Sequence, residues 1–257
     1  MHTKIVSITN QKGGVGKTTT AVNLSSSLAL MERKVLLVDL DPQGNATSGL
    51  GVVPGKLDKH LYHVMIDGVP LDDIIMETKV SGLFLAPSNA DLFGVEVELA
   101  NHPYRERIIA KALSGLQRVF DYIMIDCPPS LGILTINALT AANRLLVPVQ
   151  CEYYALEGLG NLLNTFNRIK KGLNPGLEVE GFLLTMFDPR TRLNQDIIRD
   201  VKAHFNAKVF ETIIPRNIRL SEAPSYGLPA CLYDISSKGA QRYLMLAKEM
   251  VEREGIL

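Results

Sequence analysis

The chain has 257 residues, of which 46% are apolar, and its 27 basic side chains balance 27 acidic ones. This neutrality excludes a globally basic nucleic-acid-binding protein, so any contact with nucleic acid must come from a local patch. The length and apolar content suffice for one large core, and we interpret residues 1–257 as a single domain. Three cysteines without short pairing distances, and no apolar run of the ~18 residues that span a bilayer, predict a cytoplasmic protein.

Short apolar runs bounded by turn residues predict buried strands at 5–8, 35–38, 83–86, 122–125, 145–149, 182–186 and 209–214. Segments with helical spacing lie between them, at 18–30, 105–119, 156–171, 194–205 and 238–254. This alternation predicts an α/β fold with a mainly parallel, twisted sheet and helices on both faces. A ligand is then expected at the carboxyl ends of the strands.

The segment Lys12-Gly13-Gly14-Val15-Gly16-Lys17-Thr18-Thr19 joins the first predicted strand to the first predicted helix. Its glycines let backbone N–H groups turn towards phosphates, Lys17 can reach the β- and γ-phosphates, and Thr18 can offer its hydroxyl to Mg²⁺. A flexible glycine turn is the alternative, but the strand before and the helix after favour a phosphate-binding loop, or P-loop. Gln11 stands where the common pattern has glycine. The second lysine, Lys12, is expected to serve a different phosphate.

Lys12 to Thr19 resembles the deviant Walker A motif of the ParA/MinD class of ATPases, and the rest of the chain resembles the ParA/Soj chromosome-partitioning ATPases. The resemblance implies a P-loop fold, ATP and Mg²⁺ as ligands, and an ATP-dependent homodimer in which Lys12 crosses to the partner's nucleotide. It also implies slow hydrolysis that a ParB/Spo0J-like protein stimulates. Nonspecific double-stranded DNA is the further partner it implies, together with association with the nucleoid.

The second predicted strand runs into Val38-Asp39-Leu40-Asp41-Pro42, which places two carboxylates on the same side of the chain. We expect one of them, Asp39, to orient a metal-bound water and the other to position the attacking water. The resemblance assigns the attacking water to Asp41. A turn with solvated carboxylates is the alternative.

Another apolar run ends in Ile125-Asp126-Cys127-Pro128-Pro129, as a Walker B strand does. Asp126 is expected to hold Mg²⁺ through water, opposite Thr18, because this cation prefers oxygen ligands and keeps several waters. An aspartate that caps the following helix is the alternative.

The segment Pro215-Arg216-Asn217 follows the last predicted strand. The resemblance implies that this segment binds the adenine base. The sequence lacks an Asn-Lys-x-Asp motif for guanine, so ATP is favoured over GTP. The segment 150–158 matches the family closely as well, and we place it near the dimer interface.

In Soj-type proteins the arginines that match Arg190 and Arg219 contribute to DNA binding. Solvated surface charges are the alternative interpretation of these arginines. No aromatic residues are interleaved with them, which favours phosphate contacts without sequence preference. His60 and His63 lack further ligands that would complete a metal site, and we expect them on a surface loop or helix.

Two other functions fit parts of the sequence. A MinD-like membrane switch needs a separate amphipathic C-terminal helix, whereas Tyr243, Leu246 and Met250 are typical of the core side of an integral helix, so no membrane contact is expected. The second alternative is a metabolic enzyme of the same fold, either an ATP-dependent carboxylate ligase or an iron–sulfur reductase. The reductase needs paired cysteines in glycine-rich loops, whereas Cys127 lies in a proline loop.

Overall fold

The computed structural model describes residues 3–152 and 157–255. Within these residues one sheet of seven strands has the order β3-β4-β2-β5-β1-β6-β7. All neighbours pair in parallel except β3 and β4, which are antiparallel, so the predicted fold class is confirmed. The strands are β1 (Lys4–Ile8), β2 (Val35–Asp39), β3 (Met76–Glu77), β4 (Leu83–Ala86), β5 (Tyr122–Asp126), β6 (Arg144–Gln150) and β7 (Glu178–Thr185).

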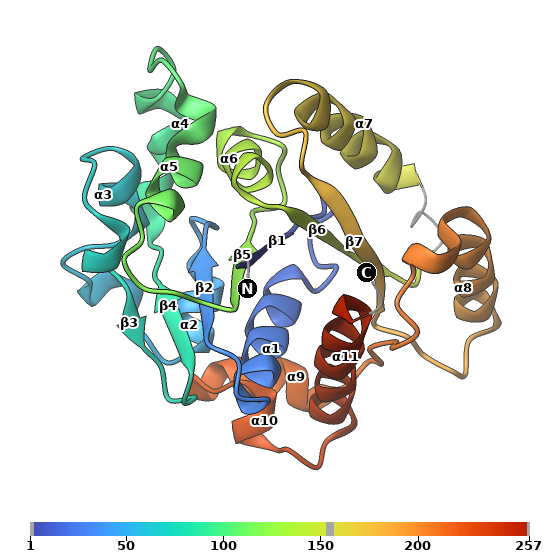
Figure 1. Cartoon of the computed structure of the whole chain (residues 1–257). Coiled ribbons are helices and arrows are strands. Elements are labelled where there is room, and N and C mark those ends of the chain that lie inside the picture. The colour runs from blue at the N-terminus through green and yellow to red at the C-terminus, as the bar shows by residue number, and fades with distance from the viewer. Residues whose placement is uncertain (1–2, 153–156, 256–257) are drawn as a thin grey trace.

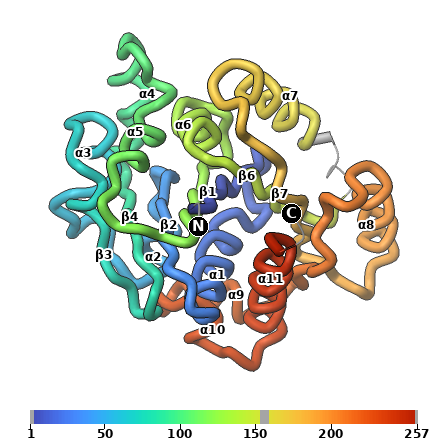
Figure 2. Tube along the Cα trace, in the orientation of Figure 1, coloured from blue at the N-terminus to red at the C-terminus, as the bar shows by residue number. Residues whose placement is uncertain are grey.

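Helices cover both faces of this sheet (Figure 1). On one face lie α1 (Lys17–Leu30), α10 (Ala230–Tyr233) and α11 (Lys238–Glu254), and on the other α3 (Leu61–Met65), α5 (Ile108–Ser114), α6 (Ile133–Ala141) and α7 (Glu157–Gly172). The remaining α-helices are α2 (Asn45–Gly49), α4 (Val95–Glu98), α8 (Arg192–Phe205) and α9 (Ile218–Glu222). The tube in Figure 2 shows α8 at the edge of the molecule beyond β7.

Alternating side chains of the central strands enter two different cores. Val35 and Leu37 of β2 pack in the cluster that contains α1 and α11, whereas Leu36 and Val38 pack in the cluster that contains α3, α5 and α6. A strand buried on both faces must be apolar at every position, which is why β2 reads as a continuous apolar run. The period of two along the strand therefore fixes which helix each side chain meets.

The segment 209–214 is not a strand, which corrects the sequence prediction. It follows β7 through two isolated bridges, from Val209 to Phe182 and from Pro215 to Phe187. The backbone amides of Glu211 and Thr212 donate instead to the Glu249 carboxylate of α11, at 2.8 and 2.9 Å. The Glu249 side chain thus accepts hydrogen bonds that a neighbouring strand would otherwise accept. The sequence prediction also missed the short edge strand β3.

The helix predicted at 105–119 is shorter in the structure, since α5 ends at Ser114 and Gly115 follows it. All three cysteines are buried, as expected of small apolar side chains. His60 is buried rather than on the surface, and it begins α3 with a reciprocal hydrogen-bond pair to His63. Among the described residues no group of three or more histidine, cysteine, aspartate and glutamate side chains is placed to hold a metal ion, and no helix has the length and apolarity to cross a membrane.

Candidate nucleotide site

The predicted P-loop connects the end of β1 to the start of α1, at the carboxyl edge of the sheet. Gly14 and Gly16 have φ angles of 73° and 87°, a left-handed conformation that only glycine adopts at little cost. Thr185, the last residue of β7, donates its hydroxyl to the Val15 carbonyl at 2.9 Å and so anchors the loop. A Cβ atom added to Gly13 or Gly14 would meet nothing within 4 Å, so the space in front of the loop is open.

Lys17 lies inside this loop with only 6% of its surface exposed. Its Nζ atom is 3.3 Å from the Lys12 carbonyl, across the loop. Burial lowers the pKa of Lys17, while the neighbouring Asp126, Cys127 and Asp41 act in the opposite direction. The lysine is therefore held between the loop and the acidic groups of the next strands, where it can meet a phosphate.

Asp126 and Asp39 are direct neighbours in the parallel pairing of β5 and β2. Asp126 is fully buried, and neither of its carboxylate oxygens has a hydrogen-bond partner among the described residues. Burial, and then the charge of Asp39, raise the pKa of Asp126 well above its usual range. The Thr18 hydroxyl lies close enough to act on this pKa in the opposite direction. Two buried oxygens without a hydrogen bond of normal geometry, beside a second carboxylate, fit a divalent cation with a preference for oxygen ligands.

The Asp39 carboxylate is oriented by α2. Its Oδ2 atom accepts hydrogen bonds from both the backbone amide and the hydroxyl of Thr47, each at 2.7 Å, and Oδ1 accepts a longer one of 3.3 Å from the Asp41 amide. Burial nevertheless raises the pKa of Asp39 to about 6. Thr47, which the sequence analysis missed, thus fixes the direction of this carboxylate.

Asp41 lies in the turn that follows β2 and is 6% exposed. Its Oδ1 atom accepts a hydrogen bond of 3.0 Å from the Gln43 amide, and the Ser88 hydroxyl donates to its carbonyl at 2.7 Å. Its charge acts on both Lys17 and Asp126. The structure therefore brings together Lys17, the two strand-end aspartates and Asp41, as the sequence pattern predicts for carboxyl ends of adjacent parallel strands.

Lys12 has a different environment from Lys17. Its side chain is 38% exposed, and its Nζ atom forms an ion pair of 2.8 Å with Glu152, just beyond β6. The Gln150 amide also donates to Glu152. Glu152 belongs to the segment 150–158 that matches the family, although residues 153–156 of that segment lie outside the described residues. The Lys12 side chain is thus bound within its own chain, whereas its carbonyl accepts from Lys17.

A pocket of 530 Å³ opens beside the loop, and Gly16, Thr19, Pro215, Arg216 and Asn217 are among the residues that line it. A smaller pocket of 280 Å³ adjoins it and includes Thr18 and Thr19. Asn217 begins α9, and its side chain accepts a hydrogen bond of 3.0 Å from the Arg219 amide. The loop residues and the segment 215–217 are therefore brought together, with room between them for a nucleoside.

A family model described as "AAA domain" matches residues 3–179. The sporulation initiation inhibitor protein Soj of Bacillus subtilis is 55% identical over 247 residues, which are 96% of this chain and 98% of that protein. The chromosome partitioning protein ParA of Myxococcus xanthus is 51% identical over 251 residues, 98% of this chain and 89% of that protein. The chain belongs to the ParA/Soj family of partitioning ATPases.

The fold also matches solved structures. The cobyrinic acid a,c-diamide synthase of Mycobacterium smegmatis, with a bound ATP analogue and magnesium, superposes with a TM-score of 0.89 and 38% identity, covering 98% of this chain and 96% of that one. A match over nearly the whole of both chains confirms that this ParA/Soj family member has the P-loop ATPase fold.

The two arginines expected to contact DNA lie outside the nucleotide pocket. Arg190 follows β7, its side chain is 88% exposed, and its guanidinium forms two contacts of 2.9 and 2.7 Å with Asp188. Arg219 of α9 is bound by Glu222 at 2.8 Å and by Asp234 at 3.3 Å. Exposed ion pairs of this kind are weak, so a phosphate can displace these carboxylates.

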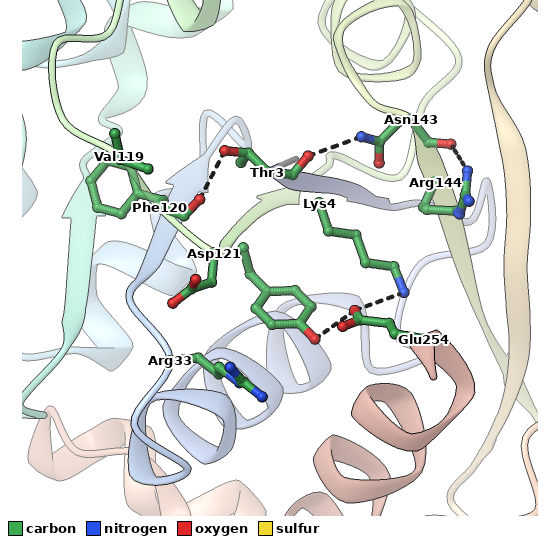
Figure 3. Close-up of a pocket in the computed structure, with 10 residues that line it drawn as sticks. Thr3, Lys4, Arg33, Val119, Phe120, Asp121, Asn143, Arg144 and Glu254 are labelled. Atoms are coloured by element: carbon green, nitrogen blue, oxygen red, sulfur yellow. Dashed lines mark hydrogen bonds and ion pairs between the residues drawn. The ribbon is translucent and has the colours of Figure 1, made fainter. Parts of the chain in front are cut away.

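The opposite edge of the sheet also has a pocket, of 380 Å³, at the amino ends of β1, β5 and β6 (Figure 3). Two of its three cations are paired with carboxylates: Lys4 contacts Glu180 at 2.8 Å and Glu254 at 3.2 Å, and Arg144 contacts Glu178 and Glu180. The third, Arg33, has no ion pair among the described residues. The carboxylates around Lys4 and Arg144 disfavour a triphosphate here, so the carboxyl edge is the better site for the family's nucleotide.

Proposed function

We propose that this chain, as a single domain of residues 1–257, is a DNA-partitioning ATPase of the cytoplasm and nucleoid. Its Mg-ATP state is a homodimer that holds double-stranded DNA without sequence preference, and hydrolysis stimulated by a ParB/Spo0J-like protein releases the DNA. The observation that carries the proposal is the contrast between two lysines of one loop. Lys17 is buried beside the acidic site, whereas Lys12 is exposed and held by Glu152.

The chain's own residues account for binding of the nucleotide. Amides of 13–19 face the phosphates, Lys17 neutralises the β- and γ-phosphates, and the pocket at 215–217 encloses the adenine. The Thr18 hydroxyl and Asp126 would hold Mg²⁺, with Asp39 oriented beside them, and the bound cation would neutralise charge on the phosphates. The free oxygens of Asp126 support this assignment.

Asp41 positions the water that attacks the γ-phosphate. The hydrogen bond from the Gln43 amide leaves the second carboxylate oxygen of Asp41 available to accept from that water. Positioning is the larger part of catalysis in phosphoryl transfer, so loss of Asp41 slows hydrolysis without removing ATP.

In the dimer, Lys12 leaves Glu152 and reaches the nucleotide of the other subunit. An ion pair with both partners more than a third exposed is worth only about 0–1 kcal/mol, so a triphosphate can compete for this lysine. A long, flexible ammonium is suited to such a move, because its charge is not fixed by several planar contacts.

DNA binding then depends on the dimer. The neutral monomer offers only local cations, whereas two-fold symmetry places two copies of the Arg190 and Arg219 region on one assembly. The membrane alternative is disfavoured because the apolar side chains Tyr243, Leu246 and Met250 of α11 are 1% exposed or less. These side chains pack in the core and cannot enter a membrane surface.

The metabolic alternative draws support from the likeness to a synthase, and one experiment separates the two functions. ATP turnover is measured alone, with DNA, with a ParB-like protein, and with both. We expect slow turnover that rises only when both are present, and no turnover by Asp41→Ala. Turnover indifferent to DNA and partner would contradict the proposal.

A further inference from the structure

A groove of 590 Å³ lies between α3 and α5. It shares no lining residue with the two pockets beside the P-loop. Figures 1 and 2 show α3 and α5 as neighbours on the outer side of the molecule. We call it the α3–α5 groove, and it is formed by α3, residues 66 and 68–71, residues 102–104, Arg107 and α5. Its size falls within the range of about 300–1,000 Å³ that is usual for ligand pockets.

The floor of the α3–α5 groove is apolar. Val64 and Met65 are 4% exposed and belong to the core beneath, while Ile66, Val69 and Ile108 are half-buried and face the groove. Half-buried aliphatic side chains in a concavity retain surface that a partner's apolar side chain can cover. The groove therefore offers a hydrophobic contact that the chain itself leaves unused.

The charged side chains that line the groove all have one sign. They are Arg107, Lys111 and, when protonated, His102, and none of the lining residues is acidic. Arg107 donates to the Leu173 carbonyl at 3.2 Å, and neither Arg107 nor Lys111 has a carboxylate partner among the described residues. This differs from Arg190, Arg219 and Lys12, each of which is neutralised within the chain.

An aromatic side chain stands at the rim. Tyr104 is 77% exposed and has a φ angle of 65°, a left-handed conformation that a tyrosine seldom adopts. Exposed tyrosines and arginines are the residues enriched where proteins bind one another. The rim thus combines an aromatic contact with unpaired cations around an apolar floor.

We propose that the α3–α5 groove binds a short acidic, amphipathic segment of a partner protein. Apolar side chains on one side of that segment enter the groove, and its carboxylates meet Arg107 and Lys111. Burial of aliphatic surface contributes affinity. The positive charges at the rim repel a basic segment and so make the groove selective for an acidic one. The site is distinct from the nucleotide face, so it gives the ATPase a second docking surface.

The test is selection from a display library of random peptides on the full-length protein with Mg-ADP, counted by sequencing. A parallel selection uses the double variant Arg107→Glu, Lys111→Glu, and a control with the same change of charge uses Arg242→Glu, Lys248→Glu, two exposed cations on α11. ATP turnover of each variant reports that it is folded. We expect peptides enriched on the parent and the control to combine Asp or Glu with Leu, Ile or Phe.

Those peptides, synthesised with a fluorescent label, should bind the double variant at least about tenfold more weakly than the parent. Versions with lysine in place of each acidic residue should show the reverse preference. Ile108→Ser, which removes aliphatic surface without adding a charge, should also weaken binding of the acidic peptides. The proposal is overturned if no acidic amphipathic peptides are enriched relative to the double variant, or if the enriched peptides bind either the double variant or Ile108→Ser as tightly as the parent.

Discussion

Replacing Glu152 by glutamine removes the carboxylate that holds Lys12 at 2.8 Å. Both side chains are about two-fifths exposed, and exposed pairs of this kind contribute about 0.2–1 kcal/mol. Because each subunit must break one such pair to release Lys12, the dimer gains about 0.4–2 kcal/mol from the substitution. The association constant of the ATP-bound dimer should therefore rise roughly 2- to 30-fold.

Sedimentation velocity with saturating ATP measures this constant, in an Asp41→Ala background that preserves the nucleotide. Glu252→Gln, which removes a comparable exposed carboxylate on α11, is the matched control and should leave the constant unchanged. In a Lys12→Ala background the effect of Glu152→Gln should vanish, because no lysine remains to be released. An equal effect in that background, or weaker association, would refute the reasoning.

Three further outcomes follow from the site. Lys17→Ala should weaken ATP binding by about 2–3 kcal/mol or more, and unchanged affinity by calorimetry would contradict the role of Lys17. Burial raises the pKa of Asp39 to about 6, above its unfolded value of about 3.9, so metal-free protein should lose stability as the pH rises between these two values. Burial also raises the pKa of Asp126, so Asp126→Asn should raise the free energy of unfolding of the metal-free protein at pH 8, and it should abolish the effect of Mg²⁺ on nucleotide affinity. Thermal melts across pH check the two statements on stability, and calorimetry of ATP binding with and without Mg²⁺ checks the third. Asp188→Asn should free Arg190 and strengthen ATP-dependent DNA binding in a filter assay, and weaker binding would count against it.

The central strands and the phosphate loop are predictable from sequence because their constraints are local. The run 83–86 matches β4 residue for residue, and 238–254 matches α11. Each is determined by its own apolar period and by the turn residues beside it. The aspartates at the ends of adjacent parallel strands are predictable for the same reason, since parallel pairing brings those ends to one edge.

Contacts between distant segments are what the sequence does not reveal. The segment 209–214 has the composition of a strand, yet the amides of Glu211 and Thr212 donate to the carboxylate of Glu249 on α11. Thr47 and Glu152 determine how Asp39 and Lys12 are held. Thr47 belongs to no motif that the sequence analysis recognised, and the family match of the segment 150–158 did not indicate that Glu152 pairs with Lys12. The positively charged rim of the α3–α5 groove likewise could not be predicted, because no local pattern around its side chains indicates that they lie beside an apolar groove.

The central claim is that ATP controls DNA binding and that this binding has no sequence preference. Its most direct test is the affinity of the Asp41→Ala variant for two unrelated duplexes, measured with ATP and with ADP over a range of salt. We predict tight binding with ATP alone, equal for both duplexes, with an affinity that falls steeply with salt. Arg190→Glu should make the slope shallower by about 0.9 for each phosphate that the arginine no longer neutralises. Binding that is equally tight with ADP, or that selects one duplex, would contradict the account.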